Sequence, residues 1–293
     1  MPAAIRCPWC GKLTSVDGSR CVECERWIPP EPLLDWLRTA LEVELPVTKF
    51  FVLLNVLVFA GELASARAKA LPLVTGVSIS SLLRFGALTN GYDSSEPWRF
   101  VSASFVHVSI LHIVMNMMGL VDFGRILEPA LKSARFTIAY LMTGVIGFAT
   151  SVWWSAGKPY VTAGASASVY GLVGLFLGAL MMRKNPLWKD MLVRLVLWGV
   201  ITAYAFNAQG LPVNNAAHIG GGLAGVLFGV VYSLETRPWR ITPILNVLAA
   251  LALIGTVVCL VLPMQSKAWP RAREEERWQQ QLRDLDRLAP DSW

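Results

Sequence analysis

Long apolar stretches separated by short polar segments run through most of this chain of 293 residues. A helix needs roughly 20 apolar residues to cross the hydrocarbon core of a bilayer. Because each stretch is close to that length, the pattern predicts an all-α polytopic membrane protein with seven transmembrane helices. The predicted helices occupy about 48–64, 103–121, 136–154, 162–182, 191–206, 215–233 and 241–263.

Two segments do not fit a transmembrane helix. The first long loop, 65–102, contains several Pro and Gly residues among scattered apolar ones, so we expect it to lie on the membrane interface or dip into it. The C-terminal tail, 264–293, is highly charged, and its apolar residues recur at helical spacing. This spacing predicts a short amphipathic helix, either solvated or lying in the interface. The apolar positions of the tail are Trp278, Leu282, Leu285 and Leu288.

Composition agrees with a membrane protein. Hydrophobic residues make up 54% of the chain and charged residues 16%, and the mean hydropathy is +0.49. These values exclude a water-soluble domain of this size. The net charge of +6 would also suit a nucleic-acid-binding protein, but the basic residues lie mostly in the predicted inner loops. We therefore expect the lipid bilayer, and no nucleic acid, as the partner of this charge.

The distribution of basic residues predicts the orientation. Loops on one side of the predicted helices hold nine Lys and Arg residues, whereas the two short loops on the other side hold only Lys158. Under the positive-inside rule, the N-terminus is cytoplasmic and the C-terminus is outside. The first 45 residues show no secretory signal peptide and no organelle targeting feature, which favours a bacterial inner (cytoplasmic) membrane. The nine basic residues are Arg125, Lys132, Arg135, Arg183, Lys184, Lys189, Arg194, Arg237 and Arg240.

Four of the five cysteines lie near the N-terminus as two C-x-x-C pairs, Cys7 with Cys10 and Cys21 with Cys24. Two tight turns at this spacing can aim four thiolates at one tetrahedral ion, which predicts a structural Zn²⁺ site in a knuckle at 1–30, joined by a linker at 31–47. A redox pair and disulfides are the competing interpretations. We expect the knuckle either to bind a cytoplasmic protein partner or to anchor the N-terminus.

All three histidines of the chain fall near the outer ends of predicted helices: His107 and His112 at the second, His218 at the sixth. Ionisable residues at membrane depth are costly, and they are often functional. The fourth and sixth helices run in the same direction, and each carries a reactive residue in its first turn. At 1.5 Å per residue, Ser166 and His218 therefore lie at one depth, where a nucleophile and its base could meet.

Small residues at helical spacing predict a close approach of the fourth and sixth helices. Such residues let two membrane helices touch backbone to backbone. Packing alone would explain them, but here the same packing brings the serine and the histidine together. The small residues are Ala167, Gly171, Gly174 and Gly178 on the fourth helix, and Gly221, Gly222, Gly225 and Gly229 on the sixth.

Four motifs resemble those of the rhomboid family of intramembrane proteases. They are Gly164-Ala165-Ser166 at the fourth helix, Ala217-His218 followed by Gly221 and Gly225 at the sixth, His112 with Asn116 at the second, and Trp98-Arg99 in the first loop. The resemblance covers about 48–233 and implies a six-helix rhomboid core, to which this chain adds a seventh C-terminal helix at 241–263. The chain departs from the family pattern at Ala167, where many rhomboids have glycine.

The resemblance implies a catalytic Ser166–His218 dyad, and predicted helices four, five and six contain no Asp or Glu that could complete a triad. It further implies that His112, Asn116 and the backbone N–H of Ser166 bind the oxyanion. Gly164, Tyr170, Gly221 and Gly225 would support the site, with Tyr170 packed on the imidazole. The segment 207–214 resembles the family's cap over the site, beside the lateral entry of substrates. His107 and Trp98-Arg99 are interpreted as structural or interfacial.

These observations predict an intramembrane serine endopeptidase that cleaves transmembrane substrate proteins near the outer face of the bilayer, with no cofactor for catalysis. The alternative is a non-catalytic rhomboid relative that binds or escorts membrane clients. A transporter or channel would need a polar pathway to the inner face or an inverted repeat, and the sequence has neither. A soluble esterase is excluded by the hydropathy and by the lack of a nucleophile elbow.

Overall fold

The structure is a computed structural model in which the chain divides into two compact units, Met1–Pro46 and Val47–Trp293. In the first unit, β1 (Ala4–Arg6) and β2 (Leu13–Ser15) pair antiparallel. A tight turn closes over residues 21–26. The described residues are 4–6, 12–15, 20–26, 45–66, 77–90, 92, 95–155, 158, 160–208, 213–235 and 238–288.

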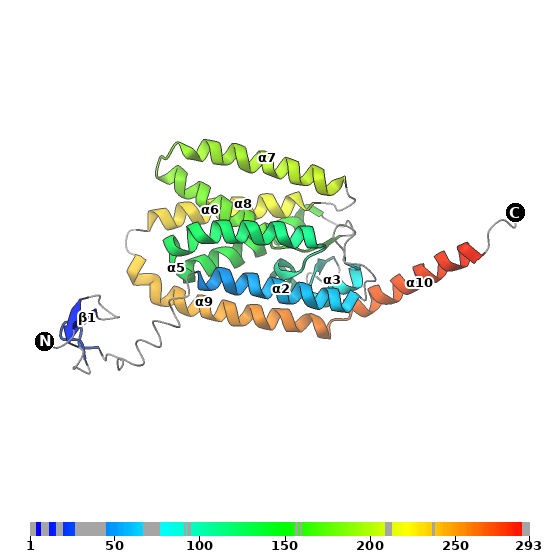
Figure 1. The fold of residues 1–293 in the computed structure, drawn as a ribbon, viewed down its shortest axis with the longest axis horizontal. Helices are drawn as coiled ribbons and strands as arrows, with labels where there is room; N and C mark the ends of the chain where they lie inside the picture. The colour runs from blue at the N-terminus through cyan, green and yellow to red at the C-terminus, as the bar shows by residue number, and fades with distance from the viewer. Residues whose placement is uncertain are drawn as a thin grey trace. The chain divides into compact units, whose positions relative to one another are not determined.

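Helices make up most of the second unit, and the long apolar ones run alongside one another (Figure 1). They form from the apolar stretches of the sequence, because a helix satisfies all its backbone hydrogen bonds within itself, as lipid requires. The long apolar helices are α2 (Pro46–Ala66), α5 (Ile110–Ser155), α6 (Ser166–Met182), α7 (Leu187–Asn207), α8 (Asn215–Leu234) and α9 (Pro238–Val261).

Helix α5 is two helices joined at a sharp break. Lys132 has φ 67° and ψ 155°, which no α-helix accommodates. Near the start of α5, His112 lies against Gly164, just before α6. Near its end, Ser151 accepts a hydrogen bond from Asn214, just before α8. The beginning of α5 therefore lies at the start of α6, and its end lies at the start of α8. Because Asn214 also donates to Thr162, just before α6, these two starts are adjacent, and the two halves of α5 form an antiparallel hairpin.

The helices confirm a multi-pass membrane protein. Four described segments are long and apolar enough to cross a bilayer: Pro46–Ser65, Ile110–Ser155, Asn215–Leu234 and Ile241–Gln265. The halves of α5 cover two of the predicted transmembrane helices, and α6 is a shorter apolar helix. The total of seven spans and the orientation of the termini stay predictions.

The predicted starts of the second and fourth transmembrane helices are too early. Residues 103–105 form the 3₁₀-helix η1 (Ala103–Phe105), and α5 begins only at Ile110. The hydroxyl of Ser109 accepts the backbone N–H of His112, a helix N-cap that sets this start. Hydropathy does not detect such a cap, because the residues around it are apolar. At the fourth helix, Val161–Thr162 pair as strand β4, and α6 begins at Ser166.

The first long loop carries short elements that pack against the helices. Arg99 is fully buried there. Its guanidinium donates to the carbonyls of Leu83 and Ala87 and to the hydroxyl of Ser266, and it forms an ion pair with Glu96 at 2.6 Å. Arg99 therefore has the structural role predicted for it. The short elements are α3 (Ile79–Phe85), β3 (Leu88–Thr89), which pairs with β4, and α4 (Arg99–Ser102).

The charged tail forms the expected helix, α10 (Ala268–Leu288), after the 3₁₀-helix η2 (Leu262–Gln265). One face of its first turns packs on α3, while the opposite face is exposed. The carboxylate of Glu276 accepts the backbone N–H and the hydroxyl of Ser80, at 2.9 and 2.7 Å, and Arg84 lies over the ring of Trp269. Trp278 is exposed farther along α10.

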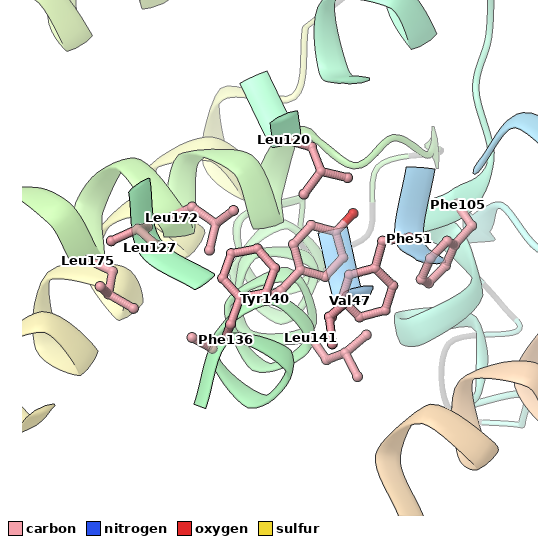
Figure 2. Close-up of a cluster of buried hydrophobic side chains, with 11 residues drawn as sticks. Val47, Phe51, Phe105, Leu120, Leu127, Phe136, Tyr140, Leu141, Leu172 and Leu175 are labelled. Atoms are coloured by element: carbon pink, nitrogen blue, oxygen red, sulfur yellow. The ribbon is translucent and has the colours of Figure 1, made fainter. Parts of the chain in front are cut away.

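A buried cluster of large side chains fixes α2, α5 and α6 to one another (Figure 2). At its centre the rings of Phe51 and Tyr140 stack with their centroids 4.4 Å apart. Beside the cluster, at the start of α2, Glu128 accepts hydrogen bonds from the backbone N–H groups of Val47 and Thr48. These bonds satisfy donors at the start of α2 that no helical carbonyl reaches.

Candidate active site

Ser166 and His218 lie within hydrogen-bond reach of each other. Nε2 of His218 is 2.8 Å from Oγ of Ser166. Ser166 is the first residue of α6, and His218 is in the first turn of α8. With Nε2 unprotonated, the hydroxyl donates to the ring, which is the arrangement in which a histidine can take a proton from a serine. Both side chains are half-buried.

The ring of Tyr170 stacks on the imidazole of His218. Their centroids are 4.3 Å apart, and the planes differ by 9°. Tyr170 lies four residues after Ser166 on α6, so it occupies the next turn on the same face. The stack holds the imidazole plane from the side of α6. Among the described residues no carboxylate contacts His218, so packing rather than a charge orients the ring.

Glycines bring α6 and α8 close enough for this contact. A Cβ at Gly225 would collide with the backbone carbonyl of Gly171, and one at Gly221 with the carbonyl of Ala167. The two helices thus touch along their backbones, as the stripes of small residues predicted. By contrast, a Cβ at Gly222 would lie 3.8 Å from its nearest neighbour. The predicted supporting roles of Gly221 and Gly225 therefore have a structural basis in helix packing.

His112 lies beside the segment that carries the serine. A Cβ at Gly164 would come within 2.6 Å of the His112 ring, and Gly164 has φ +129°, a conformation that glycine alone adopts easily. The amide of Asn116 lies one turn farther along α5 and donates to the carbonyl of His112 at 3.0 Å. The structure therefore brings His112 to the nucleophile, while the Asn116 amide bonds to its own helix.

The chain matches the Rhomboid domain family over residues 94–235. It is also 30% identical to Rhomboid-related protein 2 of Mus musculus over 218 residues, which are 70% of this chain and 70% of that protein. The chain belongs to the rhomboid family. The matched range contains Ser166, His218, His112 and Asn116.

Other rhomboid relatives match shorter parts. RHOMBOID-like protein 6, mitochondrial, of Arabidopsis thaliana is 32% identical over 55% of this chain and 53% of its own length. Rhomboid protease GluP of Bacillus subtilis is 28% identical over 50% of this chain and 28% of its own length. The chain thus spans about half the length of the Arabidopsis relative. GluP is named a protease, whereas the plant relative is named only as rhomboid-like.

Glu62, which was not predicted as a site residue, is linked through His107 to the segment before the serine in this rhomboid. It is fully buried in α2, and both carboxylate oxygens lie 3.3 Å from the backbone nitrogen of His107. The ring of His107 in turn accepts the backbone N–H of Ala165 at 3.5 Å. His107 is therefore a structural link, as expected. An acidic residue inside the apolar stretch 48–64 was the signal that could have identified Glu62.

Two predicted features lie partly outside the described residues. The cap predicted at 207–214 is described only at 207–208 and 213–214. Of the four predicted zinc ligands, Cys7 and Cys10 lie outside as well. Cys21 is buried and Cys24 half-buried in the turn, where the backbone N–H of Cys21 donates to the carbonyl of Arg26. Within the described ranges, no group of three or more His, Cys, Asp or Glu residues could hold a metal ion.

Proposed function

We propose that this rhomboid is an intramembrane serine endopeptidase that cleaves transmembrane proteins near the outer face of the bilayer. The observation that carries the proposal is the 2.8 Å separation between His218 Nε2 and Ser166 Oγ. A nucleophile and a base in contact at the start of two apolar helices have the geometry that acyl transfer requires. The family, which has a member named as a protease, agrees with this activity.

The proposed mechanism has two acyl-transfer steps. His218 takes the proton of Ser166 as Oγ attacks the scissile carbonyl, and then gives it to the leaving amine as the C–N bond breaks. Water, deprotonated by His218, hydrolyses the ester on Ser166 and restores the hydroxyl. Tyr170, stacked on the imidazole, takes the orienting part that a carboxylate has in a triad. The backbone N–H of Ser166, at a helix N-terminus, donates to the oxyanion.

The full chain in proteoliposomes provides the test. A reporter with one transmembrane helix, carrying small and helix-breaking residues near its outer end, is co-reconstituted, and its products are identified by mass spectrometry. In parallel, a fluorophosphonate probe reports on an activated serine. We expect a cleaved reporter and a probe adduct on Ser166. A reporter that cross-links to the chain but stays intact, with no adduct on Ser166, would instead indicate a relative that binds or escorts clients.

The oxyanion role proposed for His112 gives a separate prediction. We expect His112→Ala to lower the rate of reporter cleavage by about 10²–10³-fold, the usual cost of losing one such donor. Val114→Ala is the matched control, because Val114 lies two residues farther on α5 and is exposed. Initial rates at saturating reporter measure both variants. If His112→Ala retained more than about a tenth of the rate, the oxyanion assignment would be wrong.

We also propose the orientation of the chain. The break of α5 at Lys132 and the end of α6, followed by Arg183 and Lys184, are at the end of the bundle away from Ser166. The start of α2 is at this basic end too, because Thr48 bonds Glu128 near the break. Under the positive-inside rule, the basic end faces the cytoplasm and the candidate site faces outward. We propose that this membrane is a bacterial inner membrane.

The N-terminal unit is proposed to bind a structural Zn²⁺ through Cys7, Cys10, Cys21 and Cys24. The spacing of two C-x-x-C pairs supports this proposal, as does the tight turn of residues 21–26, which carries two of the thiols. The ion would fold a segment too short to bury a core. We propose that this knuckle either binds a cytoplasmic protein partner or anchors the N-terminus.

A further inference from the structure

Asn214, just before α8, makes three hydrogen bonds through its side-chain amide. Its Oδ1 accepts the backbone N–H of Ala217 at 3.0 Å. Its Nδ2 donates to Oγ of Ser151 at 2.6 Å and to Oγ1 of Thr162 at 2.8 Å. Because the backbone N–H needs an acceptor, the amide can adopt only one of its two orientations. Ser151, Thr162 and Ala217 are all buried, so water competes little for these bonds.

These bonds join the segments that lead into the two reactive residues. Asn214 lies four residues before His218, and its carbonyl accepts the backbone N–H of His218 at 3.2 Å. Thr162 lies four residues before Ser166, in strand β4. The Asn214 side chain thus connects two positions, Thr162 and Asn214 itself, each of which lies four residues before a reactive residue. Through its bond to the hydroxyl of Ser151, the same amide also contacts the end of α5.

Thr162 is itself held firmly, which gives Asn214 a fixed point to bond. Its strand pairs with β3, where Leu88 is opposite Thr162. The hydroxyl of Thr89 on β3 also donates to the carbonyl of Tyr160 at 2.8 Å. Leu88 is fully buried. The segment before Ser166 is therefore anchored to the first long loop, independently of α8.

We propose that Asn214 is a positioning residue that sets the separation of Ser166 and His218 by bonding the start of α8 to β4. The proposal rests on the proposed protease function. The glycine contacts hold α6 and α8 together beyond this point: Gly221 and Gly225 follow His218 by three and seven residues. The first turn of α8 lies before them, so its rotation and its distance from Ser166 depend on Asn214.

A serine at position 214 separates positioning from simple helix capping. Serine is as good an N-cap as asparagine, so Asn214→Ser keeps the bond to the N–H of Ala217. Its shorter side chain has no amide to donate to Ser151 and Thr162. We expect Asn214→Ser to fold with an unchanged KM and a somewhat lower melting temperature, because two buried hydroxyls lose a hydrogen-bond donor. We expect its kcat to fall by about 10–10²-fold, because a misplacement of about 1 Å between reacting groups has this effect.

Thr162→Val completes a double-mutant cycle. This change removes one of the two acceptors of the Asn214 amide and keeps the shape of the side chain. We expect kcat to fall in Thr162→Val as well, and the double variant with Asn214→Ser to be no slower than Asn214→Ser alone, because both changes break the same bond. Asn215→Ser is the matched control, since Asn215 is the adjacent residue and its side chain is exposed.

A second measurement does not depend on activity. The chain has only three histidines, so ¹⁵N-histidine NMR of the full chain in nanodiscs can be assigned with single His variants. The Nε2 signal of His218 reports its contact with Ser166, and Ser166→Ala calibrates the shift produced by losing that contact. We expect Asn214→Ser to move the signal in the same direction, and Asn215→Ser to leave it in place.

The outcomes distinguish the two proposals. An intact chain that cleaves nothing, together with a signal that moves in Asn214→Ser, would overturn the protease function and retain the positioning role. An active chain in which Asn214→Ser changes neither kcat nor the His218 signal would overturn the positioning role alone. A lower kcat together with a higher KM, with the His218 signal unmoved, would show that Asn214 has only a general structural role.

Discussion

Replacing Ser166 by alanine is expected to abolish reporter cleavage, with a loss of about 10⁴-fold or more. The hydroxyl of Ser166 is the nucleophile in contact with the His218 ring, and alanine offers no atom that can form the acyl-enzyme. His218→Ala should have a comparable effect, because an unassisted serine is a weak nucleophile. Initial rates in proteoliposomes and fluorophosphonate labelling measure both variants.

Ser168 provides a matched control for this experiment. It lies two residues after Ser166 on the same helix and is fully buried, and its hydroxyl has no hydrogen-bond partner among the described residues. Ser168→Ala should therefore cleave at the rate of the intact chain. The double variant of Ser166 and His218 should be no slower than either single one, since the pair acts as a unit. Substantial cleavage by Ser166→Ala would place the nucleophile elsewhere.

The second large effect is expected at the contact of α6 with α8. Gly225→Ala puts a methyl group against the backbone carbonyl of Gly171, which cannot rotate away as a side chain could. The helices must separate, and we expect the free energy of unfolding to fall by about 1–3 kcal/mol, as in other overpacked cores. Cleavage should fall as well, because the same separation moves His218 away from Ser166.

Gly222→Ala tests whether this loss comes from the contact or from the loss of any glycine. It lies on the same helix, but its new Cβ would be 3.8 Å from the nearest neighbour. We expect it to be neutral or to raise the free energy of unfolding by up to about 1 kcal/mol, because alanine favours a helix more than glycine does. Equilibrium unfolding in detergent micelles compares the two variants. Equal losses in both would contradict close packing at Gly225.

Residues whose roles depend on position along one helix could be predicted from the sequence. Ser166 and His218 were placed at one depth because each falls in the first turn of an apolar helix, and the structure has Oγ and Nε2 2.8 Å apart. The close helix packing at Gly221 and Gly225 was predicted from the spacing of these glycines along the helix. Tyr170 was expected on the imidazole from its place one turn after Ser166, with the resemblance to rhomboids, and the two rings stack.

Residues whose roles depend on a distant partner could not be predicted in this way. The Asn214 amide makes its two bonds only when the fold brings Thr162 and Ser151 to it, and these residues lie 52 and 63 positions away in sequence. The link from Glu62 to His107 joins two such segments as well. The late start of α5 depends on a single hydroxyl, that of Ser109, and a hydropathy window averages over it.

The bond from Arg99 to Ser266 has a consequence for the order in which the molecule is completed during synthesis. Arg99 is fully buried, and its guanidinium needs the hydroxyl of a residue that lies 167 positions later. At roughly 5–20 residues per second, the ribosome delivers Ser266 about 10–30 s after Arg99. During that interval the first long loop holds a cation without its last partner. The hydrogen bonds of Arg99 are therefore complete only after α9 has been synthesised.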